Sequence, residues 1–238
     1  MAKEIIKQLE AITHRGYSAW NVFEDWISLM FYALQRNDDE YLKIVRRYKN
    51  DRPGEREIDY FCKAFALLMS KMQETNEELL GEIYTSWEVA NKHNGQFFTP
   101  PSVSKIIAKM LAPKGGSISD PCCGAGIMLV YAAKEMTNKE LDKAVFVGQD
   151  IDFTCVKMCA LNFVFFNLNG YVIWGNTITN ERRQVFRTVR SYMGGSIVEL
   201  DAAEFQQAAV EKERKEVAAP TVVKGSKKEP SNIQVALF

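Results

Sequence analysis

The sequence predicts an α/β protein in which a helical bundle precedes a parallel β-sheet. Three observations support this prediction. Through residues 1–92 apolar residues recur every three or four positions, which is the period of a helix that buries one face. Between residues 117 and 175 short apolar runs alternate with helical patterns, as in a parallel sheet with right-handed crossovers. A turn with two glycines, residues 120–126, joins the first of these runs to the helix after it.

The first 92 residues are expected to form a bundle of about four helices. Turn-forming residues at 37–39 and 50–54 separate these helices. Thr75 followed by Glu78 resembles a capping box, which predicts that another helix starts there. Two long apolar stripes mark the best-defined helices and are expected to belong to the core. They consist of Trp20, Phe23, Ile27, Met30, Phe31 and Leu34, and of Ile58, Phe61, Phe65, Leu68 and Met72.

The α/β part begins with a loop, residues 95–101, and an amphipathic helix that ends before Pro113. After residue 176 the pattern is weaker and indicates a short helix at 188–192 and a strand at 196–200. Between these segments, strands and helices alternate at residues 117–120, 126–135, 144–150, 153–167 and 171–175.

Beyond residue 200 the composition becomes polar. Residues 201–217 are expected to form a charged helix, and residues 218–232 have the Pro, Gly, Ser and Lys content of a flexible linker. The sequence therefore divides into an N-terminal helical domain (1–92), an α/β core (93–200) and a C-terminal segment (201–238).

The overall composition argues against several classes of protein. With 30 basic and 30 acidic residues the formal net charge is zero, whereas a protein that coats DNA is strongly basic. Charges interrupt the first ten residues, and no apolar run reaches the length of about 18 residues that a membrane helix needs. We therefore expect neither export nor a membrane span. The odd number of cysteines, five, favours a reduced cytoplasmic setting.

A metal site is not expected. The chain has two histidines and no Cys-x-x-Cys pair, the residues that most often supply zinc ligands. Cys155 and Cys159 are four positions apart and would share one face of a helix. We interpret them as small buried apolar side chains.

The glycine turn and the end of the second long strand are candidates for a ligand site. Strand-to-helix turns of a parallel sheet open at its carboxyl edge, where ligands bind, and Gly124 and Gly126 let the backbone approach a ligand closely. The turn matches neither a phosphate-binding Gly-Lys-Ser/Thr loop nor a three-glycine dinucleotide fingerprint. Asp150 ends the second strand and is expected to bind ribose hydroxyls, while Asp152 is expected to cap the next helix.

Four short blocks occur in order along the centre of the chain. They are Gly-Gln-Phe-Phe-Thr-Pro at 95–100, Asp-Pro-Cys-Cys-Gly-Ala-Gly at 120–126, Gly-Gln-Asp-Ile-Asp at 148–152 and Gly-Asn-Thr at 175–177. In these blocks the chain resembles the modification subunit of type I restriction systems and related N6-adenine DNA methyltransferases. The resemblance implies a Rossmann-like methyltransferase core that binds S-adenosylmethionine, in a cytoplasmic protein of a bacterium, phage or mobile element.

By this resemblance the first two blocks hold S-adenosylmethionine. Phe98 and Thr99 would line its methionine end, Asp120 would face its amino group, and Asp150 would take its ribose. Asn176 stands where the family usually has Asp, and its amide oxygen would accept a hydrogen bond from the adenine amino group. The predicted cofactor-binding residues are Phe98, Thr99, Asp120, Pro121, Cys122, Gly124, Gly126, Asp150 and Asn176.

The sequence lacks the Asn/Asp-Pro-Pro-Tyr/Phe tetrapeptide with which the family holds a flipped-out adenine, so no catalytic residues are assigned. Its single Pro-Pro pair, Pro100 followed by Pro101, lies in the first block. The stretch 177–200 instead holds four arginines, which could meet DNA phosphate or belong to a solvated helix face. These are Arg182, Arg183, Arg187 and Arg190.

The sheet of the family has more strands than the three or four that the pattern predicts here. The first strand would then lie at an exposed edge, which residues 196–200 or a second subunit would cover. Three alternatives stay open: a truncated or degenerate methyltransferase, a cofactor-binding subunit whose partner supplies the pocket for the target base, and an enzyme with an unusual base clamp.

The last five residues resemble the short peptide by which bacterial replication and repair proteins bind the sliding clamp. Leu237 and Phe238 would anchor in an apolar pocket, and Gln234 would set the register. The alternative is a tail helix or strand that folds back on the domain.

The sequence therefore predicts an S-adenosylmethionine-dependent N6-adenine DNA methyltransferase of a restriction-modification system. Its expected partners are DNA, a second methyltransferase or specificity subunit, and the sliding clamp. The alternative is a catalytically inactive or partner-dependent subunit that binds the cofactor and associates with DNA.

Overall fold

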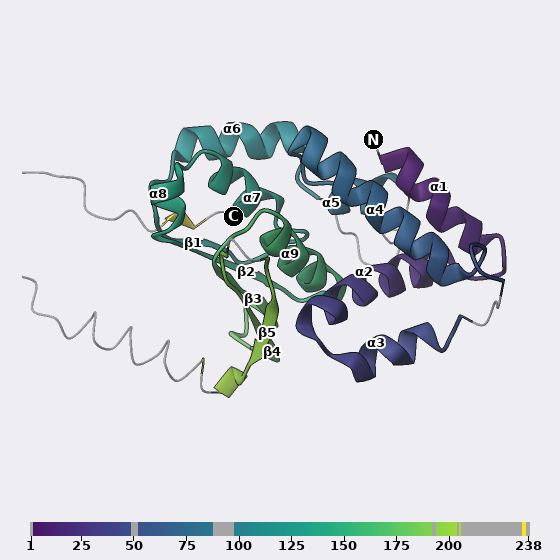
Figure 1. Ribbon diagram of the computed structural model, residues 1–238. Helices are drawn as coiled ribbons and strands as arrows, with labels where there is room; N and C mark the ends of the chain where they lie inside the picture. Colours follow the sequence, from purple (N-terminus) through teal and green to yellow (C-terminus); the bar gives the residue numbers. More distant parts are fainter. Residues whose placement is uncertain are drawn as a thin grey trace, which may run out of the picture.

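The computed structural model describes residues 2–48, 52–87, 98–191, 194–203, 205 and 235–236. Helices lie beside a twisted sheet, and the N-terminal helices reach away from the sheet (Figure 1). The helices are α1 (Ala2–Thr13), α2 (Ala19–Gln35), α3 (Asp38–Val45), α4 (Glu57–Thr75), α5 (Leu80–Ser86), α6 (Pro101–Leu111), α7 (Ile127–Lys134), α8 (Asn138–Leu141) and α9 (Phe153–Phe165). The strands are β1 (Gly116–Asp120), β2 (Ala144–Asp150), β3 (Gly170–Trp174), β4 (Gln184–Thr188), β5 (Ile197–Leu200) and β6 (Val235–Ala236).

The described strands form one mixed sheet in the order β5-β4-β3-β2-β1-β6. β1, β2 and β3 are parallel to one another, with Ile118 of β1 opposite Phe146 of β2. β4 and β5 continue the sheet in antiparallel pairing, and β6 pairs in parallel with the outer side of β1. Because β1, β2 and β3 are parallel, their carboxyl ends at Asp120, Asp150 and Trp174 meet at one edge of the sheet.

The predicted alternation of strands and helices up to residue 175 is confirmed, with element ends that shift by one or two residues. The prediction of a short helix at 188–192 is wrong. Thr188 ends β4, which the sequence pattern misses, and the described residues after it are not helical. Val185 and Phe186 point to opposite faces of β4 and are both buried, so β4 lacks the alternation of a half-exposed strand. The arginines of this stretch therefore do not form a helix face.

The expectation that residues 196–200 cover the edge of β1 is also wrong. They contain β5, which pairs with β4 at the opposite edge of the sheet. The outer neighbour of β1 is β6, in which Val235 lies opposite Ile118 and Ala236 lies opposite Ser119. These two residues of the C-terminal segment thus fold back on the sheet, as in the alternative considered for the tail.

The two apolar stripes of the N-terminal part form α2 and α4, as predicted, but the expectation that all their residues belong to the core is wrong for Phe65, which is 39% exposed. The capping box predicted at Thr75 and Glu78 is wrong, because Thr75 is the last residue of α4. The carboxylate of Glu78 instead accepts a hydrogen bond of 2.8 Å from the backbone N–H of Gly81, in the first turn of α5. Glu78 therefore caps α5 without Thr75.

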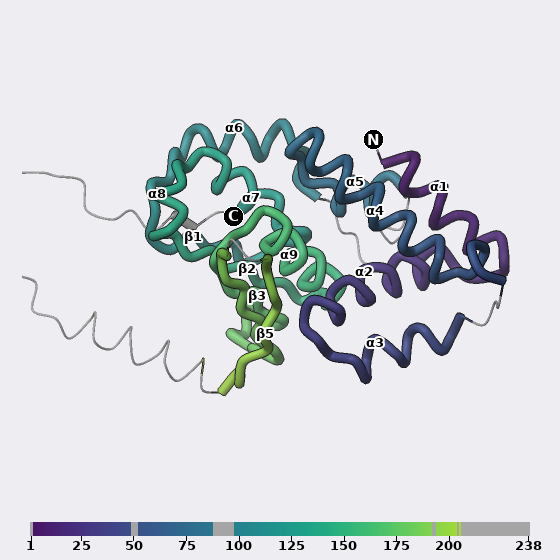
Figure 2. The backbone as a smooth tube through the Cα atoms, viewed as in Figure 1, coloured from purple at the N-terminus to yellow at the C-terminus, as the bar shows by residue number. Residues whose placement is uncertain are grey.

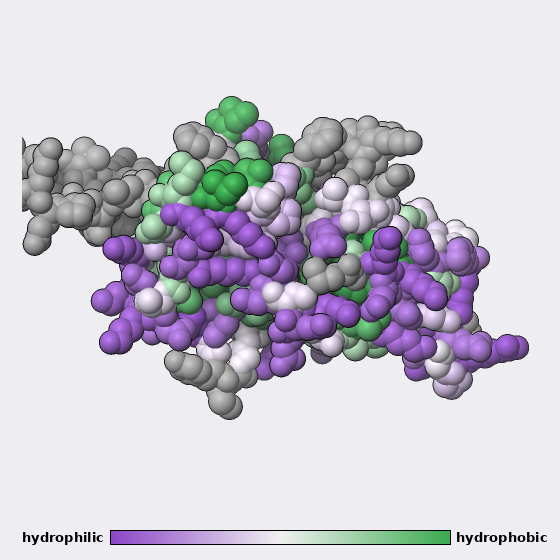
Figure 3. Space-filling model, turned by 90° about the horizontal axis from the view of Figure 1, so that it is seen from above, coloured by the Kyte–Doolittle hydropathy of each residue, from purple (hydrophilic) through white to green (hydrophobic). Residues whose placement is uncertain are grey.

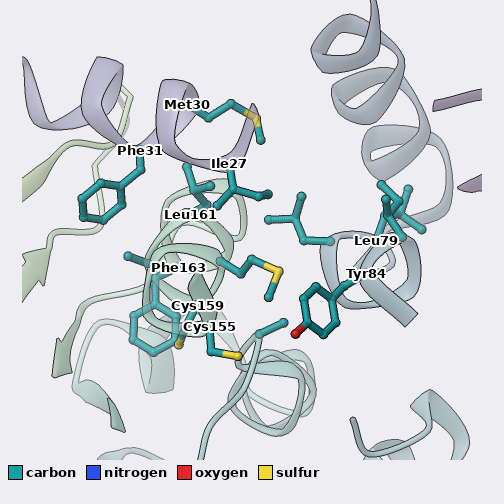
Figure 4. Close-up of a cluster of buried hydrophobic side chains, with 14 of the residues drawn as sticks. Ile27, Met30, Phe31, Leu79, Tyr84, Cys155, Cys159, Leu161 and Phe163 are labelled. Carbon is teal, nitrogen blue, oxygen red and sulfur yellow. The ribbon is translucent and has the colours of Figure 1, made fainter. Parts of the chain in front are cut away.

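The N-terminal helices and the sheet share one hydrophobic core. The path of the chain brings α2 beside α9, which packs on the sheet (Figure 2). Ile27 and Phe31 of α2 lie near Leu161 of α9 (Figure 4). The ring of Phe31 also lies 5.1 Å from the ring of Phe186 in β4, so the helical part and the sheet stabilise each other directly.

The outer face of α6 is apolar and exposed. This is unexpected, because its apolar residues have the spacing of a helix that buries them. Met110 is 79% exposed, and Val103, Ile106 and Leu111 are exposed as well. From above, on the side of the molecule where α6 lies, an apolar patch interrupts the polar surface (Figure 3).

Three findings concern the cysteines, metal-binding groups and the length of the helices. Cys155 and Cys159 are buried in the core, as predicted (Figure 4). Within the described ranges, no group of three or more His, Cys, Asp or Glu side chains is arranged to hold a metal ion. None of the described helices is long and apolar enough to cross a bilayer.

Candidate functional site

A cavity of about 970 Å³ opens at the carboxyl ends of β1, β2 and β3. Its volume lies in the range of pockets that hold small molecules. The turns after the three strands, the N-terminus of α9 and one face of α2 form its walls. The predicted cofactor-binding residues that line it are Phe98, Pro121, Cys122, Gly124, Asp150 and Asn176.

Asp150 lies at the tip of β2 and is held by backbone donors. Its Oδ2 accepts a hydrogen bond of 2.9 Å from the N–H of Gly124, and its Oδ1 accepts one of 2.9 Å from the N–H of Asp152. Burial raises the pKa of Asp150 in spite of these hydrogen bonds, which favour the ionised form. The carboxylate therefore has a fixed position on the wall of the cavity.

Asp152 caps α9, as predicted. Its Oδ1 accepts hydrogen bonds from the backbone N–H groups of Thr154, at 2.7 Å, and Cys155, at 3.3 Å. Capping by a carboxylate satisfies helix N–H groups that have no partner within the helix. The two acidic residues after β2 thus have separate positions, and the predicted contact of Asp150 with a ribose stays a prediction.

Asp120 is buried under the glycine turn and does not line the cavity. It is 2% exposed, and its Oδ1 accepts a hydrogen bond of 3.1 Å from the N–H of Cys122. Burial raises the pKa of Asp120 to about 6, and the nearby charge of Asp150 adds to this effect. Asp120 therefore holds the shape of the turn and changes its charge close to neutral pH.

The two glycines of the turn have different surroundings. A Cβ atom at Gly124 would come within 2.8 Å of the ring of Phe98, so this ring rests directly on the turn beside the cavity. A Cβ atom at Gly126 would come within 2.7 Å of the Sγ of Cys159. Gly126, which does not line the cavity, therefore permits close packing of α9, a role that the sequence did not indicate. Thr99 does not line the cavity either.

The turn after β3 is tied to the turn after β1. Thr177 donates a hydrogen bond of 2.6 Å from its hydroxyl to the carbonyl oxygen of Pro121. The side-chain oxygen of Asn176 accepts a hydrogen bond of 2.9 Å from the N–H of Ile178. The same oxygen accepts a second, longer hydrogen bond of 3.4 Å from the N–H of Thr179, so the turn itself engages the oxygen that was predicted to meet an adenine.

A buried polar pair beneath the turn was missed by sequence reasoning. The side-chain amide of Asn162 donates to the Oε1 of Glu78, at 2.9 Å, and to the carbonyl oxygen of Ala125, at 2.8 Å. Burial raises the pKa of Glu78. The pair connects the start of α5, the glycine turn and α9, and so supports the floor of the site. No local pattern identifies Asn162, because it lies within a helix whose other residues are mostly apolar.

α2 supplies two further residues to the cavity wall that were not predicted to lie there. Trp20 and Glu24 line the cavity opposite the turns of the sheet. Trp20 belongs to an apolar stripe and was assigned to the core. The signal that could have found this wall is the charged Glu24, one helical turn after Trp20 on the same face of α2.

The predicted clamp-binding residues, Gln234, Leu237 and Phe238, lie outside the described residues.

Three parallel strands, a glycine turn after β1 and a carboxylate at the tip of β2 define a fold of the Rossmann-like class. A model of the family described as N-6 DNA Methylase matches residues 75–195, which is half of the chain. The chain therefore belongs to this family and has its Rossmann-like methyltransferase core, as the sequence predicted.

Similar sequences are methylase subunits of type I restriction enzymes. That of MjaIX from Methanocaldococcus jannaschii is 28% identical over 134 residues, which cover 53% of this chain and 24% of the relative. That of MjaVIII from the same organism is 24% identical over 204 residues, which cover 78% of this chain and 35% of the relative. This chain thus spans between 24% and 35% of the length of these relatives.

Solved structures include similar chains. The methyltransferase subunit of a type I restriction-modification system from Streptococcus thermophilus is 17% identical and has a TM-score of 0.42. The match covers 65% of this chain and 40% of that subunit.

Proposed function

We propose that the chain binds S-adenosylmethionine in the cavity at the ends of β1, β2 and β3, and that it acts in N6-adenine methylation of DNA in a restriction-modification system. The observation that carries the proposal is the carboxylate of Asp150, held by the N–H of Gly124 on the wall of a cavity of about 970 Å³. When bound, this cofactor supplies an electrophilic methyl group on a sulfonium.

The residues around the cavity fit such a cofactor. Gly124 has a φ of +52° and no side chain, so a ligand can lie against the backbone of the turn. Phe98 offers an apolar ring beside this turn for the methionine chain. The charged residues of the cavity wall, Glu24, Asp150 and Asp152, are all acidic, and their charge complements the net positive charge of the cofactor.

Each predicted residue has a proposed part in holding the cofactor. Asp150 accepts hydrogen bonds from the ribose hydroxyls with its carboxylate oxygens. Asn176 accepts a hydrogen bond from the adenine amino group with its side-chain oxygen, in exchange for the long hydrogen bond from the N–H of Thr179. Asp120 attracts the amino group of the methionine end through its charge, because it lies below the turn and not on the cavity wall.

A second candidate function is that of a subunit that needs a partner. The sequence has no Asn/Asp-Pro-Pro-Tyr/Phe tetrapeptide for the target adenine. On the outer side of β1 the described part of the chain contributes only the two residues of β6, and the apolar face of α6 is exposed. A second methyltransferase or specificity subunit that covers these surfaces would supply the pocket for the target base.

Transfer of tritium from labelled S-adenosylmethionine to adenine in duplex DNA separates the two candidates. An autonomous enzyme incorporates the label alone, whereas a partner-dependent subunit does so only after it is mixed with a complete type I modification subunit and specificity subunit. Asp150→Ala is the control, because it removes the carboxylate of the proposed cofactor site. Absence of transfer in every combination contradicts the enzymatic function.

Calorimetry with S-adenosylhomocysteine tests the cofactor site that both candidates share. The wild-type chain is expected to bind this product, and Asp150→Ala is expected to bind it more weakly. A wild-type chain that binds neither the cofactor nor the product contradicts both candidates.

We also propose that Gln234, Leu237 and Phe238 bind the bacterial sliding clamp. The two described residues of the tail, Val235 and Ala236, pair with β1. Immobilised clamp is expected to retain the full chain but not the double variant Leu237→Ala, Phe238→Ala. Equal retention of the variant contradicts this proposal and leaves the cofactor site unaffected.

A further inference from the structure

We propose that Trp20 of α2 recognises the sulfonium of S-adenosylmethionine, and that it thereby distinguishes the cofactor from its neutral demethylated product. This inference rests on the cofactor site proposed above. It adds a wall to that site which comes from the N-terminal helices and not from the sheet.

α2 forms one wall of the cavity opposite the turns of the sheet. Trp20 and Glu24 both line the cavity and lie one helical turn apart on the same face of α2. The start of α2 is fixed by Ser18, whose side-chain oxygen accepts a hydrogen bond of 3.1 Å from the N–H of Asn21. The backbone at Trp20 is therefore held in place by a capped helix.

A chain of aromatic contacts places Trp20 at the end of the cavity where the glycine turn lies. The ring of Trp20 is 6.3 Å from the ring of Tyr84, in an edge arrangement, and Tyr84 is 4.9 Å from Phe98. Phe98 in turn rests on Gly124. The methionine end of the cofactor is proposed to lie against this turn, which brings its sulfonium to the end of the cavity that Trp20 and Phe98 line.

The charges around the cavity favour a cation. Its charged lining residues are all acidic, and neither Lys nor Arg is among the described residues that line it. The nearby Lys157 is buried; its Nζ donates a hydrogen bond of 2.7 Å to Ser28 and lies 3.8 Å from Glu24. Lys157 is therefore held by α2 and is not directed into the cavity.

Tryptophan is the aromatic side chain that attracts a cation most strongly, because its π-system presents a negative face. S-adenosylmethionine carries its positive charge on sulfur next to the transferred methyl group. The product S-adenosylhomocysteine has the same nucleoside and amino acid but a neutral thioether. A contact that depends on the charge of the sulfur therefore favours the cofactor over the product.

The test compares the dissociation constants of both compounds by calorimetry for the wild-type chain, Trp20→Leu and Trp20→Phe. Trp20→Leu is expected to weaken binding of S-adenosylmethionine by about 2- to 30-fold more than binding of the product, since a cation–π contact contributes about 0.5–2 kcal/mol. Trp20→Phe keeps an aromatic face and is expected to retain most of the selectivity. Sinefungin, which carries a charged amine in place of the sulfonium, is expected to follow the cofactor.

Phe65→Leu is the matched control, because it removes an aromatic ring from α4 that does not line the cavity. Its ratio of the two dissociation constants is expected to equal that of the wild-type chain. If Trp20→Leu loses affinity for both ligands equally, or loses none, the inference about Trp20 is overturned while the cofactor site stands. A wild-type chain that binds neither compound contradicts the proposed function itself.

Discussion

At the residue scale, the carboxylate at the end of β1 is affected by the carboxylate at the end of β2. Burial is the main cause that raises the pKa of Asp120 to about 6, and the charge of Asp150 adds to it. Burial also raises the pKa of Asp150. Because two neighbouring carboxylates are costly to ionise in a poorly solvated site, a bound cation offsets part of their repulsion. The site is therefore sensitive to pH.

Asp120→Asn is expected to remove part of this sensitivity. In the wild-type chain, affinity for S-adenosylmethionine should increase as the pH rises through about 6, because Asp120 then gains the charge that attracts the cofactor. The variant should bind more weakly above this pH and show a flatter profile. Calorimetry across this pH range measures the effect, and an unchanged profile in the variant contradicts the proposed part of Asp120.

Asp120 also makes the stability of the folded chain depend on pH, but stability falls with rising pH whereas affinity for the cofactor rises. The pKa of Asp120 is raised in the folded state, so the folded chain binds a proton more tightly than the unfolded chain does. The contribution of Asp120 to the free energy of unfolding is therefore lost as the pH rises from the ordinary pKa range of an aspartate through about 6. Urea unfolding of the ligand-free wild type and Asp120→Asn over this range checks the sign.

Gly126→Ala is expected to destabilise the chain more than Gly54→Ala. Both glycines have a left-handed backbone, with φ of +81° and +84°, which costs about 1–2 kcal/mol for an alanine. At Gly54 nothing lies within 4 Å of an added Cβ, whereas at Gly126 the Sγ of Cys159 is 2.7 Å away. The extra loss in the free energy of unfolding should be about 1–3 kcal/mol.

Urea unfolding of both variants measures this difference. Adding Cys159→Ala should recover part of the loss in Gly126→Ala, because it removes the sulfur that the new methyl group meets. Equal losses at the two glycines contradict the packing role of Gly126.

At the scale of elements, α9 has two functions because its sides and its N-terminus have different surroundings. Its sides are buried between α2 and the sheet, so its sequence is mostly apolar all round. Its N-terminus faces the cavity, where Asp152 caps it and Asp150 precedes it. The sequence predicted this cap correctly, because a capping residue is recognised from its immediate neighbours.

Asp152→Ala is expected to lower the free energy of unfolding by about 1 kcal/mol, the typical effect of losing a helix cap. Asp152→Asn should keep this stability, since an amide oxygen caps nearly as well, but should weaken binding of a cationic cofactor because it removes a charge from the cavity wall. Thr137→Ala, at the cap of α8, is the control for a lost cap that does not line the cavity. Equal stability of Asp152→Ala and the wild type contradicts the cap.

At the scale of the whole molecule, one core unites the N-terminal helices with the sheet. Phe31 of α2 meets Phe153 of α9 at 6.2 Å and Phe186 of β4 at 5.1 Å between ring centroids. These contacts cross the boundary near residue 92 that the sequence predicts between a helical domain and an α/β core. Because α2 also lines the cavity, loss of this core contact would displace a wall of the site.

Phe31→Ala is expected to lower the free energy of unfolding by about 3–5 kcal/mol, since it opens a cavity in the shared core. Phe65→Ala, at a position that is 39% exposed, should lose clearly less. Hydrogen exchange of amides in α2 and in β4 should report the same loss for Phe31→Ala, because both elements depend on the contact. Loss of protection in the helices alone would indicate two independent domains.

The sequence by itself determined the parallel strands, the helices between them, the glycine turn and the acidic residues after β2, because these depend on hydrophobic period and turn chemistry within a few residues. Tertiary structure decided which distant residues join that site. It brought Trp20 and Glu24 to the cavity, placed Cys159 against Gly126, made Thr188 the end of a strand and paired Val235 with Ile118. These outcomes depend on contacts between segments far apart in the chain, and no local pattern contains them.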